Sequence, residues 1–194
     1  MPATTLDPRT ALVVIDLQRG ITGHPVQPHS AADTIARSAE LAAAFRKRGL
    51  PVVLVNVDFS ADGGDVPPGR TEGPASRGAL PEGWAELVDE LDVQPTDLRI
   101  TKRNWGAFHG TGLDVQLRRR GITGIVLTGI ATSIGVESTA RAAHEHGYNV
   151  TIATDASSDL DADSHHHSVS KIFPRLGETA TTAEILALLE ASAG

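Results

Sequence analysis

Short apolar runs alternate with helical patterns along the whole chain. The runs consist largely of valine, isoleucine and leucine, which is typical of parallel strands buried on both faces. The helical patterns repeat alanine and leucine every three or four residues with charged residues opposite, and glycines such as Gly49 and Gly147 follow their ends. Strands are therefore predicted at residues 11–15, 51–57, 98–101, 125–127 and 150–154, and helices at residues 31–48, 83–91, 112–120, 134–146, 162–173 and 181–191.

This alternation of strands and helices predicts one architecture. It is a doubly wound α/β fold of Rossmann type, a three-layer α/β/α sandwich around a mainly parallel sheet. No internal repeat or linker interrupts the pattern, and 194 residues suit one domain with a full core. We therefore expect a single domain over residues 1–194.

Residues 121–155 form the stretch around which the chain is organised. The strand at residues 125–127 leads into a turn of small residues, among them Gly129 and Ser133, and a helical pattern follows. Backbone N–H groups converge where a strand feeds a helix N-terminus, and the helix dipole there favours negative charge. Open α/β sheets bind their ligands at this edge, so the turn is the first candidate for a functional site.

Two segments break the alternation. Residues 21–30 are rich in glycine, proline and histidine and indicate a loop. Residues 58–80 contain five of the chain's 19 glycines and several prolines, which predicts a long irregular segment. Segments of this kind are usually lids, binding loops or oligomer contacts.

The composition excludes several classes of function. The chain has no cysteine, so disulfides, thiolate metal sites and cysteine nucleophiles are impossible. A formal net charge of −7 argues against nucleic acid or anionic lipid as a main partner, and no apolar run approaches membrane-spanning length. The first ten residues lack the charged start and apolar core of a secretory signal. We expect a cytoplasmic protein with a small-molecule substrate.

Two charged residues follow predicted strands. Asp16 ends the strand at residues 11–15, and Lys102 follows the strand at residues 98–101. The carboxyl ends of parallel strands share one edge of the sheet, so both side chains can converge on the turn at residues 129–136. Lys102 would lower the pKa of Asp16 whereas burial would raise it, and the balance depends on the folded geometry.

Three motifs bring a resemblance. The stretches VVIDLQ, TKRNWGAFHGTGL and LTGIATSIGVESTARAAHEHGYNVTIATDA resemble the isochorismatase-like hydrolase superfamily, in the same order over nearly the whole chain. Most members are cysteine hydrolases with an Asp-Lys-Cys triad. The resemblance implies that Asp16 is the acid and Lys102 the lysine, and that Gly135 occupies the position of the nucleophilic cysteine.

Gly135 changes the chemistry that the resemblance implies. Glycine has no side chain, so no acyl-enzyme can form at this position. True isochorismatases, which also have Ile-Gly here, cleave a vinyl ether and release pyruvate without a covalent intermediate. Asp16 could deliver the proton, directly or after taking it from a substrate hydroxyl, while Lys102 holds a substrate carboxylate. The turn at Gly135 would leave room and offer N–H donors.

The expected substrate contacts surround these three residues. The aromatic residue and the histidine that isochorismatases have in the stretch of Ala131 and Ser133 are absent, so the substrate can differ from isochorismate. Trp105 and Phe108 could line a pocket for a ring substrate, although core packing would explain them equally well. The predicted substrate-binding residues are Gln18, Trp105, Phe108, Ala131, Ser133 and Ile134.

Other residues that could suggest a metal or phosphate site have simpler interpretations. Residues 165–167 are three consecutive histidines, which point about 100° apart on a helix and cannot converge on one ion; we expect a solvated helix face. Nicotinamidase-like relatives bind zinc through an Asp-x-His motif, but Ser60 stands at the histidine position here, so we expect no catalytic metal and no cofactor. His109 is expected in an exposed loop, and residues 110–112 lack the spacing of a phosphate-binding loop.

Two other functions stay open. The chain could be a pseudoenzyme or small-molecule binder that kept the pocket, or an amidase that uses water or Ser133 instead of cysteine. The superfamily resemblance also implies a homo-oligomer, a dimer or tetramer, and residues 58–80 could supply its contacts.

Overall fold

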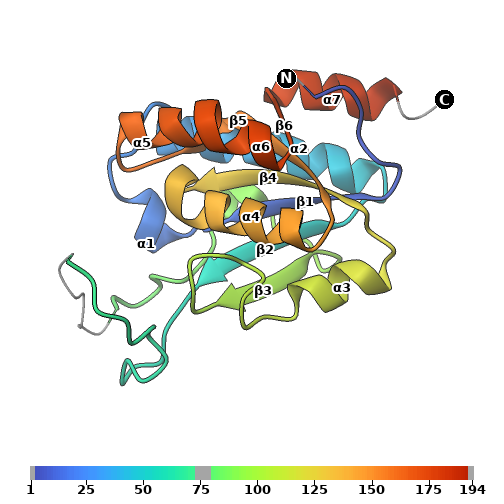
Figure 1. Cartoon of the computed structure of the whole chain (residues 1–194). Helices are drawn as coiled ribbons and strands as arrows, with labels where there is room; N and C mark the ends of the chain where they lie inside the picture. The colour runs from blue at the N-terminus through green and yellow to red at the C-terminus, as the bar shows by residue number, and fades with distance from the viewer. Residues whose placement is uncertain (1–2, 73–79, 192–194) are drawn as a thin grey trace.

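A six-stranded parallel sheet forms the centre of the molecule (Figure 1). The structure is a computed structural model and describes residues 3–72 and 80–191. The strands lie in the order β3-β2-β1-β4-β5-β6, and every neighbouring pair is parallel. Their bounds are β1 Thr10–Ile15, β2 Val52–Val57, β3 Leu98–Lys102, β4 Gly124–Ile130, β5 Asn149–Ser158 and β6 Glu178–Ala180.

Helices cover both faces of this sheet. Their bounds are α1 Arg19–Thr22, α2 Ala31–Lys47, α3 Leu113–Arg119, α4 Glu137–Glu145, α5 Ala162–His167, α6 Phe173–Leu176 and α7 Thr182–Ala191, with a 3-10 turn at Asp89–Leu91 and π-helical turns at Thr132–Val136 and Ser168–Ile172. Helices α2 and α7 pack on one face, and α3, α4 and α6 pack on the other. The doubly wound three-layer α/β architecture predicted from the sequence is confirmed.

Strand β1 shows how the sequence produces two cores. All six of its residues are buried. Leu12 and Val14 face the core under α2 and α7, whereas Val13 and Ile15 face the core under α3 and α4. Successive side chains of a strand point to opposite faces, so a continuously apolar run is needed when both faces are covered.

The structure corrects several predicted elements. Residues 83–91 do not form a helix: Gly83 has φ +73°, Leu87 pairs with Gln18 in an isolated antiparallel bridge, and only a 3-10 turn follows. Strand β5 extends four residues beyond its predicted end, and the short elements α1 and β6 were not predicted. The expected helix at residues 162–173 exists and continues through α6.

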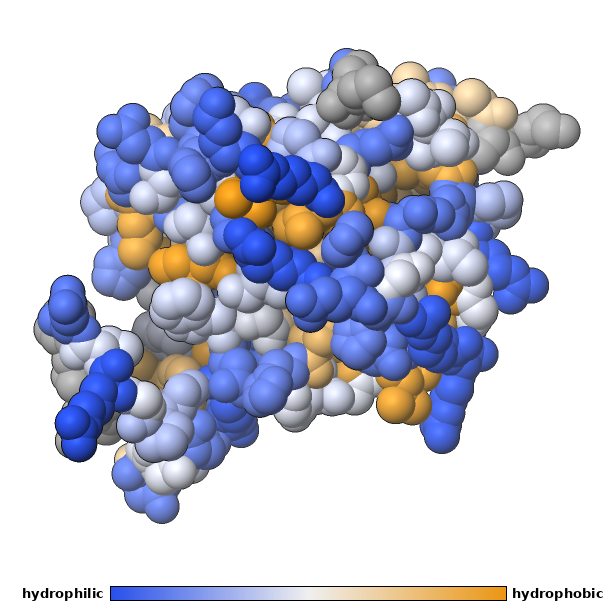
Figure 2. All heavy atoms as spheres, viewed as in Figure 1, coloured by the Kyte–Doolittle hydropathy of each residue, from blue (hydrophilic) through white to orange (hydrophobic). Residues whose placement is uncertain are grey.

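The segment after β2 projects from the body of the molecule. Its described part, residues 58–72, has no helix or strand and is drawn at the lower left of Figure 1. Figure 2 shows mainly hydrophilic residues on this projection. Asp65 ties this segment to the residue that follows β3, since its carboxylate accepts a hydrogen bond from Arg103 Nε at 2.5 Å. The irregular structure predicted for residues 58–80 is confirmed in this part, and residues 73–79 lie outside the described residues.

Candidate active site

The carboxyl ends of β1 and β3 bring Asp16 and Lys102 together. Asp16 follows β1 directly, has φ +54°, and donates its backbone N–H to Val55 O of β2 at 2.9 Å. Lys102 is the last residue of β3. Its Nζ lies 2.7 Å from Asp16 Oδ2 and donates a second hydrogen bond, of 3.1 Å, to the carbonyl oxygen of Asn104. The convergence expected from the parallel strands is therefore present.

Both members of this ion pair are buried, and one carboxylate oxygen has no partner. Asp16 is 5% exposed and Lys102 is 2% exposed. Asp16 Oδ1 is buried without a hydrogen-bond partner among the described residues. Burial raises the pKa of Asp16 to about 6, although the charge of Lys102 and its hydrogen bond act in the opposite direction. A carboxyl group with this pKa exists in both protonation states near neutral pH, as an acid–base catalyst requires.

The turn between β4 and α4, residues 131–136, faces Asp16. It is a π-helical turn in which Ala131 O accepts hydrogen bonds from Ile134 N and Val136 N, each 3.2 Å long. The Ile130–Ala131 peptide before it is cis. Gly135 of this turn lies beside Asp16: a Cβ atom added at Gly135 would be 3.3 Å from Asp16 Oδ2.

A Cβ atom at Gly135 would be crowded by its neighbours. A Cβ atom there would lie 2.9 Å from Ile15 Cγ2, closer than real Cβ contacts come. The same atom would lie 3.5 Å from the carbonyl oxygen of Trp105, which places the loop after β3 beside the turn. A side chain at Gly135 would therefore require Ile15, which is fully buried, to move.

Thr139 ties this loop to the turn. Its hydroxyl donates a 2.7 Å hydrogen bond to Gly135 O and accepts a 3.0 Å bond from Ala107 N. All three residues are buried. One side chain of α4 thus fixes the loop that follows Lys102 and the backbone of Gly135 relative to each other.

Two of the expected substrate contacts bond or pack inside the protein. Gln18 is fully buried, and its amide group bonds to the backbone: Nε2 donates to Val57 O and Trp84 O, while Oε1 accepts from Val57 N. Phe108 packs its ring against His146 and Tyr148, with centroid distances of 5.2 and 5.8 Å, in the core under α3 and α4. Gln18 thus braces the end of β2, and Phe108 packs in the core, while their role as substrate contacts stays a prediction.

The other four expected contacts lie in or beside the turn. Ala131, Ser133 and Ile134 belong to the turn and are each half-buried. Trp105 is 65% exposed, while its backbone is part of the loop that contacts the turn. These positions can border a substrate that reaches Asp16, and their role as substrate contacts stays a prediction.

The histidine run is not uniformly solvated. His166 and His167 are exposed, as expected, but His165 is only 6% exposed, and its Nδ1 lies 2.8 Å from Thr132 Oγ1. Asp159 is also buried in this region and accepts a 2.6 Å hydrogen bond from Ser133 N. Sequence reasoning missed Thr132, Asp159 and His165 as supports of the turn. Asp159 follows β5 at the carboxyl edge of the sheet, which is a signal that could have found it.

The residues at the place of the zinc motif of nicotinamidase-like members bond to their own neighbours. Asp58 bonds to the backbone N–H of Phe59, and Ser60 bonds to Asp62 and Asp65. Within residues 3–72 and 80–191, no group of three His, Cys, Asp or Glu side chains is arranged to hold a metal ion. None of the helices in this part of the chain is both long and apolar enough to cross a membrane.

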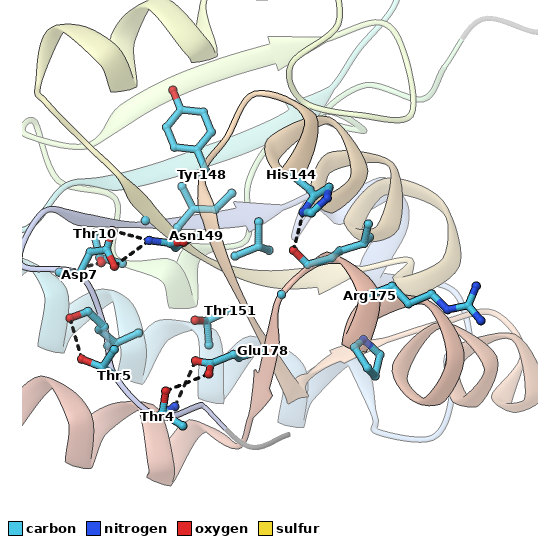
Figure 3. A pocket seen from close by; sticks show the side chains of 17 residues that line it. Thr4, Thr5, Asp7, Thr10, His144, Tyr148, Asn149, Thr151, Arg175 and Glu178 are labelled. Atoms are coloured by element: carbon cyan, nitrogen blue, oxygen red, sulfur yellow. Dashed lines mark hydrogen bonds between the residues drawn. The ribbon is translucent and has the colours of Figure 1, made fainter.

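A groove of about 530 Å³ lies at the opposite edge of the sheet (Figure 3). It surrounds the amino ends of β1, β4 and β5, and its carboxylates are bonded within the chain. Asp7 accepts from Asn149 Nδ2 at 2.9 and 3.1 Å, and Glu178 accepts from the backbone and the hydroxyl of Thr4. The groove is therefore separate from the candidate site at Asp16.

Comparisons with known proteins agree with this geometry. The sequence model described as isochorismatase domain matches residues 10–184. The isochorismatase family protein YecD of Escherichia coli O157:H7 is 48% identical over 177 residues, which are 91% of this chain and 94% of YecD. The ureidoacrylate amidohydrolase RutB of Variovorax paradoxus is 33% identical over 174 residues, 78% of this chain and 69% of RutB. An isochorismatase family protein from Burkholderia thailandensis has a similar structure, with a TM-score of 0.93, 52% identity, and coverage of 96% of this chain and 98% of that protein.

Proposed function

This chain belongs to the isochorismatase family and is a hydrolase, and we propose that it acts without a covalent intermediate on a small carboxylated substrate. The proposed reaction is hydrolysis of a vinyl ether, with isochorismate or an analogue as substrate and pyruvate as product. One observation carries the proposal: the buried carboxyl group of Asp16, whose Oδ1 has no partner among the described residues and whose pKa is raised to about 6, lies beside the turn at Gly135.

The first step is proton transfer from protonated Asp16 to the methylene carbon of the vinyl ether. This transfer gives an oxocarbenium ion and leaves Asp16 ionised. Lys102, 2.7 Å from Oδ2, stabilises the carboxylate that forms. Removing such a proton donor commonly lowers the rate by about 100- to 10,000-fold.

Water completes the reaction. It adds to the oxocarbenium carbon and releases a proton, which restores the acid form of Asp16. The hemiketal that results collapses into pyruvate and an alcohol. No side chain forms a bond to the substrate in these steps, which matches the absence of cysteine from the chain and the presence of glycine at position 135.

The negative charge of the substrate's carboxylate also needs a partner in this site. We assign that role to Lys102, whose ammonium group has three donors and uses two of them within the chain. The backbone N–H groups of the turn at residues 131–136 lie at the start of a helix, where they favour negative charge. Trp105, Ala131, Ser133 and Ile134 would border the rest of the substrate.

An amidase without a cysteine nucleophile is the second candidate. The observation that favours it is the similarity to RutB, whose name describes an amidohydrolase. Ser133 is the hydroxyl-bearing residue of the turn nearest Gly135 in sequence. Ammonia release from small amides that is abolished in Ser133→Ala would support this function, and insensitivity to the substitution would end it.

A protein that binds its ligand without turnover is the third reading of the same site. In that case Asp16 and Lys102 would serve only the fold. A loss of thermal stability in Asp16→Asn with no activity in the unaltered protein would favour it.

We further propose a cytoplasmic homo-oligomer, a dimer or tetramer, in which the projecting residues 58–72 make contacts; a monomeric mass in light scattering would refute this assembly.

The test is pyruvate release from isochorismate by the unaltered protein, Asp16→Asn and Asp97→Asn. Asp97 is the matched control, because its side chain is 1% exposed and is bonded to Arg46 at 2.7 Å at the start of β3, the end opposite Lys102. We expect pyruvate from the unaltered protein and from Asp97→Asn, and a rate at least about 100-fold lower from Asp16→Asn. Equal loss in both variants would show a general effect of breaking a buried ion pair.

A further inference from the structure

A buried hydrogen bond joins the turn at residues 131–136 to α5. Thr132 Oγ1 and His165 Nδ1 are 2.8 Å apart. Thr132 is fully buried and His165 is 6% exposed. A buried pair of this kind is costly to break from one side, because the remaining polar atom then has no partner. The contact therefore constrains where the start of the turn can lie.

A second bond fixes the next residue of the turn from the same direction. Asp159, 2% exposed, accepts a 2.6 Å hydrogen bond from Ser133 N through Oδ2 and a 2.8 Å bond from Leu160 N through Oδ1. The segment from Asp159 to His165 thus holds two consecutive residues of the turn. Two residues farther along, a Cβ atom at Gly135 would lie 3.3 Å from Asp16 Oδ2, so the turn runs beside the carboxylate there.

The surroundings of His165 favour a neutral imidazole. Burial lowers the pKa of His165, the nearby His29 and His166 lower it further, and the carboxylate of Asp159 raises it. The His29 ring meets the His165 ring edge-on, with centroids 5.9 Å apart. A neutral imidazole has one nitrogen that accepts a hydrogen bond, so Nδ1 can accept a hydrogen bond from the Thr132 hydroxyl.

We propose that His165 is a positioning residue, which through Thr132 sets the turn at residues 131–136 against Asp16 and keeps water away from that carboxyl group. The inference rests on the proposed function for its effect on turnover. Its structural part, the dependence of the environment of Asp16 on His165, can be tested with no substrate present. His165 does not contact the reacting atoms in this scheme and is not a catalytic residue.

The test compares two pairs of variants. His165→Leu removes the ring nitrogen, whereas His165→Asn keeps an amide group near the position of Nδ1. Thr132→Val removes the hydroxyl with little change in shape, whereas Thr132→Ser keeps it. His166→Leu is the matched control, because His166 is the exposed neighbour on the same helix.

The first readout is the titration of the Asp16 carboxyl carbon by NMR. Burial is the largest cause of the raised pKa, so a turn that admits water should lower the midpoint from about 6 towards 3.8. We expect this shift in His165→Leu and Thr132→Val, and its reversal in His165→Asn and Thr132→Ser. The double variant His165→Leu with Thr132→Val should shift the midpoint no further than either single one, because both remove the same bond.

The second readout is the split between kcat and KM. A displaced turn should lower kcat by about 100-fold in His165→Leu with a smaller effect on KM, and His166→Leu should match the unaltered protein. A folded His165→Leu or Thr132→Val whose Asp16 midpoint stays at the unaltered value overturns the proposal, whatever its thermal stability. If the unaltered protein releases no pyruvate, the proposed function fails, while the NMR titration still decides the role of His165.

Discussion

The Lys102 ammonium reaches Asp16 across an intervening strand. Nζ and Oδ2 are 2.7 Å apart, although β3 and β1, which supply the two residues, are separated by β2 in the sheet. Lys102 therefore holds Oδ2 of the carboxylate, whereas Oδ1 has no partner among the described residues. The geometry therefore fixes the acid while leaving one of its oxygens available for a proton.

The pH dependence of turnover should follow the titration of the Asp16 carboxyl group. Because the pKa of Asp16 is raised to about 6, we expect kcat/KM for the proposed reaction to be constant at lower pH and to fall as pH rises above about 6. The fall should reach about tenfold per pH unit, since only the protonated acid delivers its proton. A pH–rate profile checks this. A rate that rises through pH 6 would contradict direct delivery by Asp16.

Removing the charge of Lys102 should shift the midpoint of the pH–rate profile to higher pH. The charge of Lys102 and its hydrogen bond both lower the pKa of Asp16. In Lys102→Met we therefore expect the midpoint to rise by about one pH unit or more and the maximal rate to fall, because the ionised carboxylate loses its stabilising partner. An NMR titration of the Asp16 carboxyl carbon measures the midpoint directly. An unchanged midpoint would show that the ion pair does not control this acid.

Filling position 135 should destabilise the protein. Alanine normally stabilises a helical position by about 1 kcal/mol relative to glycine, but here its Cβ would lie 2.9 Å from Ile15 Cγ2. Overpacking of this kind costs about 1–3 kcal/mol. We expect Gly135→Ala to lower the free energy of unfolding in urea and to reduce kcat/KM. Gly112→Ala is the control, since a Cβ atom there meets nothing within 4 Å; equal effects would show that the contact with Ile15 is unimportant.

Asp16 should make stability fall with rising pH. The folded protein keeps the proton of Asp16 up to a pKa of about 6, whereas the unfolded chain releases it near 3.8. More protons are then bound in the folded state between these values, so the free energy of unfolding decreases by about 2 kcal/mol from pH 3.8 to pH 6, out of about 3 kcal/mol lost over the whole titration. Urea unfolding across this range measures the effect. The slope of Asp16→Asn should lack this contribution, and identical slopes would contradict a raised pKa.

The strand pattern was sufficient to predict where the acid and the lysine meet. Asp16 and Lys102 each stand at the end of a predicted strand, and parallel strands bring such ends to one edge whatever the details of packing. The same reasoning places the turn predicted at residues 129–136 beside them. Gly135 was identified only through the family resemblance, because a glycine in a small-residue turn has no distinguishing pattern of its own.

The supports of the turn could not be predicted from local patterns. His165 belongs to a run of three histidines, and its burial depends on α5 packing against Thr132, a contact between residues 33 positions apart. Phe108 follows Lys102 closely in sequence, yet the loop after β3 turns its ring into the core beside Tyr148. The apolar spacing at residues 83–91 suggested a helix, but Leu87 pairs with Gln18 instead. In each case a tertiary contact decides the outcome.

Turnover of isochorismate in D₂O tests acid catalysis by Asp16 most directly. The deuterated carboxyl group should deliver one deuterium to the methylene carbon, so the unaltered protein is expected to release pyruvate with a singly deuterated methyl group, measured by mass spectrometry. Folded Asp16→Asn should release it at least about 100-fold more slowly. No pyruvate from the unaltered protein, or an undiminished rate from Asp16→Asn, would contradict the proposed function.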